Sequence, residues 1–214
     1  MSTANATATA TRARAGLYLL GIEPHALSID EDRLIARAQS GDRAAFEELV
    51  RIYAERLHAV VLRLCANGHD AEEVTQEAFL RAWRAIDRFD GRSHFFTWLY
   101  RIGINEAKRH SQRRQRMRVI SIDDAPPGEL TDPSEAPEAR ARQSEARAAL
   151  EAAVSALPID YRAPLVLRDI AGLSTTEAAE ILGLSEAAFK SRLHRARVSV
   201  REAVKHDLPG EAGS

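Results

Sequence analysis

The sequence has one cysteine in 214 residues and no apolar run approaching the length of a membrane span. With Cys65 alone, the chain can form no internal disulfide and no zinc site built from cysteines. Cys65 ends the apolar run of residues 60–65, which favours a small core residue over a redox group. Residues 1–28 are rich in Ala and Thr, and their apolar patch is too short for a signal peptide or a transmembrane helix. The sequence therefore predicts a flexible N-terminal extension over residues 1–28 and a cytoplasmic protein without membrane insertion.

Catalytic motifs are also missing. His69 and Asp70 precede two glutamates, but no paired histidines stand at metal-ligand spacing beside them. The chain has no phosphate-binding Gly-Lys-Ser/Thr loop, and no Ser or Cys nucleophile lies in a recognisable setting. These absences predict that the protein is not an enzyme and uses neither a cofactor nor a metal ion.

The chain has little net charge, −1, but the charges are unevenly distributed. Residues 81–118 contain eleven Lys or Arg and three Asp or Glu, which gives +8 (11 − 3). Residues 119–160 contain three Arg and nine Asp or Glu, which gives −6 (3 − 9). Such blocks indicate a surface that faces nucleic acid, followed by an acidic connector.

Apolar residues recur at helical spacing through most of the chain, and no strand-type alternation of useful length is present. Helices are expected over residues 30–39, 43–66, 71–86, 95–116, 137–156, 159–170, 175–182 and 185–204. Asp42 is expected to cap the second helix, Asn67-Gly68 to end it, and Asp70 with Glu73 to begin the third. Between residues 120 and 138 four prolines stand among acidic and small residues, a composition typical of a linker. The prediction is an all-α fold of two helical domains, 29–118 and 138–206, joined by a flexible acidic linker over 119–137 and followed by a tail over 207–214.

Residues 173–185 have the pattern of a helix-turn-helix. Ala178 and Ala179 permit close helix approach, Gly183 supplies the turn, and Ser185 can cap the second helix. Residues 183–206 contain six Lys or Arg and two Glu, which gives +4 (6 − 2). The second helix of this motif normally enters the DNA major groove. The alternative is a surface helix whose charges face solvent, but the turn glycine, the cap and the charge favour DNA binding.

Residues 70–83 predict an amphipathic helix with an unusual outer face. Val74, Ala78 and Ala82 point inward, while the outer face combines acids, an amide and the exposed Leu80. Such a surface suits a protein partner with basic residues. Chemistry alone leaves a solvated acidic face as an equal alternative.

A polar loop over residues 90–94 precedes aromatic residues and then a basic helix. The loop is a candidate site for an extruded base of single-stranded DNA, while the basic helix follows phosphates. The helical spacing of Phe95, Trp98 and Leu99 favours the competing interpretation that these three side chains are core.

These motifs, in this order, resemble the extracytoplasmic-function sigma factors of bacterial RNA polymerase. Residues 30–118, with Asp70–Phe79, Phe89–Gly91, Thr97–Ile102 and Asn105, resemble sigma domain two. Residues 138–204, with Leu157-Pro158, Leu173-Ser174 and Lys190–Arg197, resemble sigma domain four. The resemblance implies an alternative sigma factor that binds core RNA polymerase, directs it to promoters and assists DNA melting.

The resemblance also implies roles for particular residues. Binding of the clamp of the polymerase's largest subunit falls on Glu73, Gln76, Glu77, Phe79 and Trp83. Recognition of the −10 element, including a flipped base of the melted non-template strand, falls on Asp90, Gly91, Arg92, Ser93, His94, Arg101, Asn105, Lys108, Arg109 and Arg113. Recognition of the double-stranded −35 element falls on Lys190, Ser191, Arg192, His194 and Arg195.

The chain departs from the family at Ala188-Phe189, where Thr-Val is common, so the first turn of the recognition helix is expected to pack differently. Two ways of masking the binding surfaces in the free protein stay open: an anti-sigma partner, or packing of the two domains against each other. The alternative function is a free-standing helix-turn-helix regulator. That alternative leaves the acidic face of residues 70–83 without a purpose.

Overall fold

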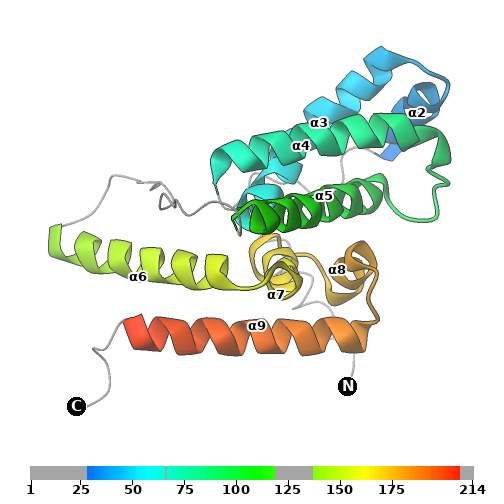
Figure 1. The fold of residues 1–214 in the computed structure, drawn as a ribbon. Coiled ribbons are helices and arrows are strands. Elements are labelled where there is room, and N and C mark those ends of the chain that lie inside the picture. Colours follow the sequence, from blue (N-terminus) through cyan, green and yellow to red (C-terminus); the bar gives the residue numbers. More distant parts are fainter. Residues whose placement is uncertain (1–27, 66, 119–136, 208–214) are drawn as a thin grey trace.

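A computed structural model of the chain describes residues 28–65, 67–118 and 137–207 (Figure 1). Every regular element in these ranges is helical, so the expected all-α fold is confirmed. Within them no helix is both long and apolar enough to cross a membrane. The predicted N-terminal extension, acidic linker and tail lie outside the described residues, apart from one residue at the edge of each.

The first two helices are α2 (Ser28–Gln39) and α3 (Arg43–Leu64). Asp42 caps α3 as expected, accepting a hydrogen bond from the Ala45 N–H at 3.2 Å. Arg37 donates to the same carboxylate at 2.6 Å and joins the two helices. The buried face of α3 follows the predicted helical spacing from Phe46 to Leu64.

Helix α4 (Gly68–Ala85) begins earlier than expected. We predicted Asp70 as the cap of a helix that begins at residue 71, but Asn67 is the cap and accepts a hydrogen bond from the Asp70 N–H at 2.8 Å. The Asp70 carboxylate is instead buried and paired with Arg114. Asn67 was misassigned as the end of α3, since Asn is a preferred N-cap but is also found at helix ends.

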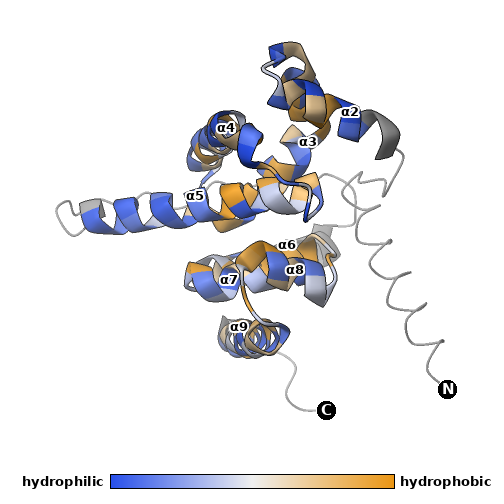
Figure 2. Cartoon of the chain, turned by 90° about the vertical axis from the view of Figure 1, so that its right-hand side faces the viewer, coloured by the Kyte–Doolittle hydropathy of each residue, from blue (hydrophilic) through white to orange (hydrophobic). Residues whose placement is uncertain are grey.

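The first domain is completed by the 3₁₀ turn η1 (Ile86–Arg88) and by α5 (Phe95–Arg118), which packs on α3 and α4. At Gly103 the Leu57 side chain of α3 packs against the α5 backbone, and an added Cβ would lie 2.7 Å from the Leu57 Cδ1 atom. Phe95 and Leu99 are buried as expected, and Trp98 is half-buried against Phe89. The C-terminal half of α5 projects from the domain and is almost uniformly hydrophilic (Figure 2).

The second domain comprises α6 (Pro137–Ala156), α7 (Ile159–Leu165), η2 (Val166–Ile170), α8 (Thr175–Leu182) and α9 (Glu186–Asp207). A single helix was expected over residues 159–170, but its last five residues widen into a π-helix. The Ala171 N–H then bonds the Val166 carbonyl five residues back, at 2.8 Å.

Helix α8 begins with a capping box, in which Ser174 accepts from the Glu177 N–H and the Glu177 carboxylate accepts from the Ser174 N–H. It ends at Gly183, whose φ of +63° is the left-handed turn expected of the helix-turn-helix. Ser185 caps α9, accepting from the Ala188 N–H at 3.3 Å. Phe189 is fully buried, so the unusual Ala188-Phe189 pair directs its aromatic ring into the domain core.

Gly183→Ala is expected to lower the free energy of unfolding by about 1 to 2 kcal/mol, because a Cβ is disfavoured in the left-handed region. The space around Gly183 is open, so backbone strain alone is responsible. Gly68→Ala is the matched control, since Gly68 is equally open but lies in the first turn of α4. Urea unfolding of both variants checks the prediction, and equal losses in the two would contradict it.

The second domain packs along α5 (Figure 1). Helices α7 and α8 contact α5 and separate it from α9. Cys65 lies near this boundary and is half-buried, and burial raises the pKa of its thiol to about 12. A protonated thiol at neutral pH fits the packing role expected for Cys65 rather than a redox role.

Candidate nucleic-acid and protein interfaces

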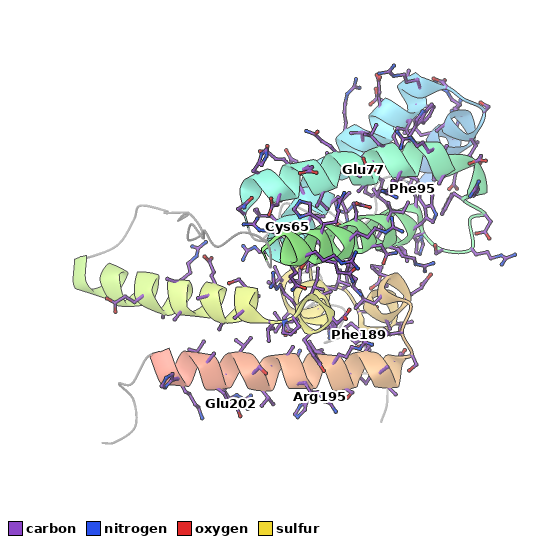
Figure 3. The ribbon with its side chains drawn as sticks, in the orientation of Figure 1. Cys65, Glu77, Phe95, Phe189, Arg195 and Glu202 are labelled. Atoms are coloured by element: carbon purple, nitrogen blue, oxygen red, sulfur yellow. The ribbon has the colours of Figure 1, made fainter. Side chains whose placement is uncertain are left out.

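One face of α4 carries acidic and amide side chains beside an exposed leucine. We call Glu73, Gln76, Glu77 and Leu80 the α4 rim. Glu73 and Gln76 are exposed, Glu77 is half-buried, and Leu80 is 50% exposed. The Glu77 side chain, marked in Figure 3, forms an ion pair with Arg81 at 3.0 Å. An exposed apolar side chain among carboxylates gives the rim both a contact area and a charge for a basic partner.

The two aromatic residues expected at the same surface are less accessible. Phe79 is 9% exposed and belongs to the core. Trp83 is half-buried, with its ring 5.0 Å from that of Phe46. Phe79 therefore supports the α4 rim from beneath, whereas Trp83 retains some exposed ring surface beside it.

The loop over residues 90–94 is held in a defined turn. Gly91 has a φ of +71°, and the Asp90 carboxylate accepts a hydrogen bond from the Arg92 N–H at 3.1 Å. The Arg92 side chain returns to the same carboxylate at 3.1 Å. Ser93 is half-buried and the other four residues are exposed. His94 stacks nearly parallel to Phe96, with 5.7 Å between the ring centroids. A turn of this kind can present polar atoms and a flat ring to a nucleobase.

The DNA-facing residues expected on α5 fall into two groups. Asn105, Arg109 and Arg113 are exposed. Arg101 and Lys108 instead contact the second domain: Arg101 donates to the Glu180 carbonyl at 3.0 Å, and Lys108 pairs with Asp160 at 2.8 Å. We call this packing of the second domain on α5 the closed arrangement.

The Lys108–Asp160 pair has an electrostatic consequence. The hydrogen bond from Lys108 lowers the pKa of the Asp160 carboxyl below its ordinary value. Asp160 therefore remains charged at neutral pH, and the pair is lost only as the pH falls through that lowered pKa. A third contact across the boundary runs from the Arg162 guanidinium to the Leu64 carbonyl, at 3.2 Å.

The residues expected to read the −35 element lie along α9, away from α5 (Figure 1). Four of them are exposed and Arg192 is half-buried. Lys190 pairs with Glu186 at 3.2 Å, and Glu186 also accepts a hydrogen bond from Thr176 of α8 at 2.7 Å. The Thr176 bond, with that of Lys190, lowers the pKa of the Glu186 carboxyl. Arg195 stands on the outer face of α9 (Figure 3). The closed arrangement thus leaves the four exposed residues of α9 open, whereas Arg192 lies near Asp160 of α7 and part of α5 is occupied.

Sequence reasoning missed Glu106. This is the single acidic residue among residues 101–118, and its side chain is 1% exposed. Its carboxylate pairs with Arg81 of α4 at 2.8 Å and with Arg109 and Arg113, each at 3.3 Å. A lone acid within a basic segment was the available signal. Within the parts of the chain that the structure describes, no cluster of His, Cys, Asp or Glu could hold a metal ion.

Comparisons with known proteins identify the family of both domains. The sigma-70 region 2 family matches residues 49–117, and the sigma-70 region 4 family matches residues 147–200. The RNA polymerase sigma-H factor of Pseudomonas aeruginosa is 34% identical over 181 residues, covering 82% of this chain and 94% of that protein. The ECF RNA polymerase sigma-E factor of Escherichia coli K12 is 36% identical over 178 residues, covering 80% and 93%.

Two solved structures share the fold. CnrH in complex with the cytosolic domain of CnrY has a TM-score of 0.59 and 29% identity, covering 82% of this chain and 97% of that chain. The sigma factor RpoE from Bartonella quintana, in complex with the anti-sigma factor NepR, has a TM-score of 0.59 and 25% identity, covering 76% and 98%.

The fold and its basic helices define a DNA-binding transcription factor. The matches to both sigma-70 regions and to near-full-length relatives define it further: the chain belongs to the extracytoplasmic-function sigma factor family. It is an alternative sigma factor that acts in transcription initiation, with core RNA polymerase and promoter DNA as its partners. Sigma factors are non-catalytic transcription factors.

Proposed function

We propose that the three surfaces divide the work of promoter recognition. The α4 rim, with Trp83 beside it and Phe79 beneath, binds core RNA polymerase. The loop over residues 90–94 and α5 bind the −10 element, and α9 binds the −35 element. The observation that carries the proposal is the α4 rim, because a free-standing DNA-binding regulator would leave its acids and exposed Leu80 unused.

Helix α9 is suited to duplex DNA. Its exposed side chains are basic or polar at Lys190, Ser191, His194 and Arg195, and its opposite side is fixed in the core by Phe189. Arginine and lysine can bond guanine edges or phosphates in the major groove. The turn at Gly183 sets the angle at which α9 leaves α8 and so orients this face.

The loop over residues 90–94 is suited to the melted strand. Its backbone turn is fixed by Asp90 and Gly91, so its polar groups are positioned before DNA arrives. Asn105, Arg109 and Arg113 are exposed and, at i, i+4 and i+8, share one stripe of α5, along which the proposed strand continues. Unstacking a base costs a few kcal/mol. The contacts that the polymerase and the loop make with DNA would together offset this cost.

Full use of α5 requires the second domain to move away. Arg101 and Lys108 cannot reach DNA while they bind the Glu180 carbonyl and Asp160. Polymerase would separate the domains by binding each at its own promoter element, and the linker expected over residues 119–137 would keep both at high effective concentration. Because two relatives are known in complexes with partners, one of them an anti-sigma factor, such a factor is also a candidate regulator of this chain.

The proposal includes a cytoplasmic location, where promoter DNA and polymerase meet. In this proposal the chain catalyses no reaction and requires no cofactor or metal ion. The chain acts by positioning, because its contacts hold polymerase at two DNA elements.

Weakening the closed arrangement is expected to help the free chain bind the −10 strand. Asp160→Lys removes the partner of Lys108, and an exposed ion pair of this kind contributes at most about 1 kcal/mol. The affinity of the free chain for a single-stranded −10 oligonucleotide should rise by up to about fivefold. Fluorescence anisotropy measures it, with Glu55→Lys on the exposed side of α3 as the control for added positive charge. A rise as large in the control would show that charge alone is responsible.

Site-specific photocrosslinking tests the division of work. A photoreactive amino acid is placed in turn at Gln76, Ser93 and Ser191, with exposed Glu55 on α3 as the control position. In the promoter complex, position 76 should crosslink to the largest polymerase subunit, position 93 to the non-template strand of the −10 element, and position 191 to the −35 duplex. A crosslink from position 76 to DNA rather than to polymerase would overturn the assignment of the α4 rim.

A further inference from the structure

Four arginines from two helices line a cavity beside the buried Glu106, and three of them pair with its carboxylate. Arg81 comes from α4, and the other three, Arg109, Arg113 and Arg116, come from α5. Together with Glu106 and Gln112 they line a surface cavity of about 270 Å³. Its lining carries four positive charges and one negative charge, a net +3 (4 − 1). We call this group the arginine cluster.

The arginine cluster is held in place by a buried carboxylate. The Glu106 carboxylate is almost inaccessible to solvent and uses both oxygens to hold three guanidinium groups. Burying a carboxylate is costly unless it is paired, so these contacts stabilise Glu106 in its buried position. The paired arginines nevertheless remain 41% to 59% exposed. Each guanidinium therefore keeps donors that point to solvent while its orientation is fixed from beneath.

The chemistry of the cluster fits a phosphate. Guanidinium groups bind phosphate oxygens through paired hydrogen bonds, and several fixed donors can share one phosphate group. The lining consists of charged and amide side chains alone, whereas typical small-molecule pockets are lined mainly by apolar and aromatic side chains. That lining favours a phosphate of a polymer backbone over a free nucleotide, whose base would need an apolar wall. Arg109 and Arg113 are also exposed on α5, the helix that directly follows the loop over residues 90–94.

We propose that the arginine cluster binds a backbone phosphate of promoter DNA, with Arg81 and Arg116 as phosphate ligands and Glu106 as the positioning residue that orients the guanidinium groups. The proposal rests on the proposed function of α5 and extends the DNA surface to α4. It also assigns Arg109 and Arg113 to the backbone, so these two residues contribute affinity rather than base preference.

The salt dependence of promoter binding tests the two new ligands. Each lost phosphate contact reduces the slope of log affinity against log salt concentration by about 1. Polymerase holoenzyme assembled with Arg81→Gln or with Arg116→Gln should show that reduction and should weaken by the same factor on every promoter. Arg51→Gln is the control, since Arg51 is an exposed, ion-paired arginine on α3. Unchanged slopes in both variants would overturn the proposal, as would loss of holoenzyme formation in place of DNA affinity.

Glu106→Gln tests the positioning role through the sign of its effect. A carboxylate that only opposes DNA electrostatically would, on removal, raise the affinity of the holoenzyme for promoter DNA. A carboxylate that orients the arginines would, on removal, lower it, and the proposal predicts the lower affinity. Urea unfolding establishes that the variant is folded, and the Arg81 and Arg116 variants keep the test valid if it is not.

Two further measurements distinguish a DNA phosphate from a free anion, and a failure of the arginine cluster from a failure of the proposed function. Inorganic phosphate alone, titrated into the chain at millimolar concentration, should leave the arginine cluster unoccupied, and saturation there would indicate a free-anion site instead. If wild-type holoenzyme fails to bind any promoter, the proposed function itself fails. If it binds but the variants leave the slope unchanged, only the arginine cluster proposal fails.

Discussion

Glu77→Arg is expected to lower the affinity of the chain for core RNA polymerase by at least about 100-fold. The substitution places a positive charge in the middle of the α4 rim, where the proposed partner is basic, and like charges brought together at an interface cost several kcal/mol. It also removes the 3.0 Å ion pair with Arg81, although Arg81 keeps its 2.8 Å contact with Glu106. Binding to labelled core polymerase measures the effect.

Glu47→Arg is the matched control for this variant. Glu47 forms a comparable i,i+4 ion pair with Arg43, at 3.1 Å, on the exposed side of α3. The control therefore has the same charge change and loses the same kind of pair outside the proposed surface. If Glu77→Arg binds polymerase as well as Glu47→Arg does, the α4 rim is not the docking surface.

Arg195→Ala is expected to weaken recognition of the −35 element by about 1 to 3 kcal/mol, which is between about fivefold and 150-fold in affinity. Arg195 is exposed on the outer face of α9, and the contact it loses would be with a base edge. The measurement is holoenzyme affinity for a promoter and for the same promoter with a scrambled −35 element. Because the scrambled promoter lacks that base, the variant should bind it as well as wild type does.

Arg201→Ala controls for the charge removed. Arg201 is an exposed arginine further along the same helix, outside the proposed contact residues. It should change both promoters slightly and equally. An equal loss on the intact and scrambled promoters in Arg195→Ala would contradict base recognition and assign Arg195 to the phosphate backbone instead.

The helices themselves were predictable because their signals are local. Asp42, Gly183 and Ser185 mark helix ends through capping or backbone conformation, and each does so in the structure. The cap of α4 was wrong because Asn67 lies between two helices and its type fits either role. The π-helix over residues 166–170 has no sequence signal of comparable strength.

Contacts between residues far apart in the chain could not be predicted from the sequence. The Glu106 carboxylate meets Arg81 across 25 positions, and Arg101 meets the Glu180 carbonyl across 79. Helical periodicity places a side chain on a face but does not say which charged groups of another helix it will meet. For the same reason the sequence did not show that Phe79 is buried while the residues of the α4 rim are accessible. The family resemblance supplied the roles of the surfaces, and the residue assignments within them remain predictions for the experiments above.

Run-off transcription tests the central claim most directly. The purified chain is added to core polymerase on a panel of genomic promoter fragments, and the transcripts are sequenced. The account predicts discrete transcripts from a subset of promoters, dependent on the chain and sharing −10 and −35 elements, and their loss with Glu77→Arg. Absence of any promoter-specific transcript, together with sequence-specific DNA binding by the chain without polymerase, would contradict it and indicate a free-standing helix-turn-helix regulator.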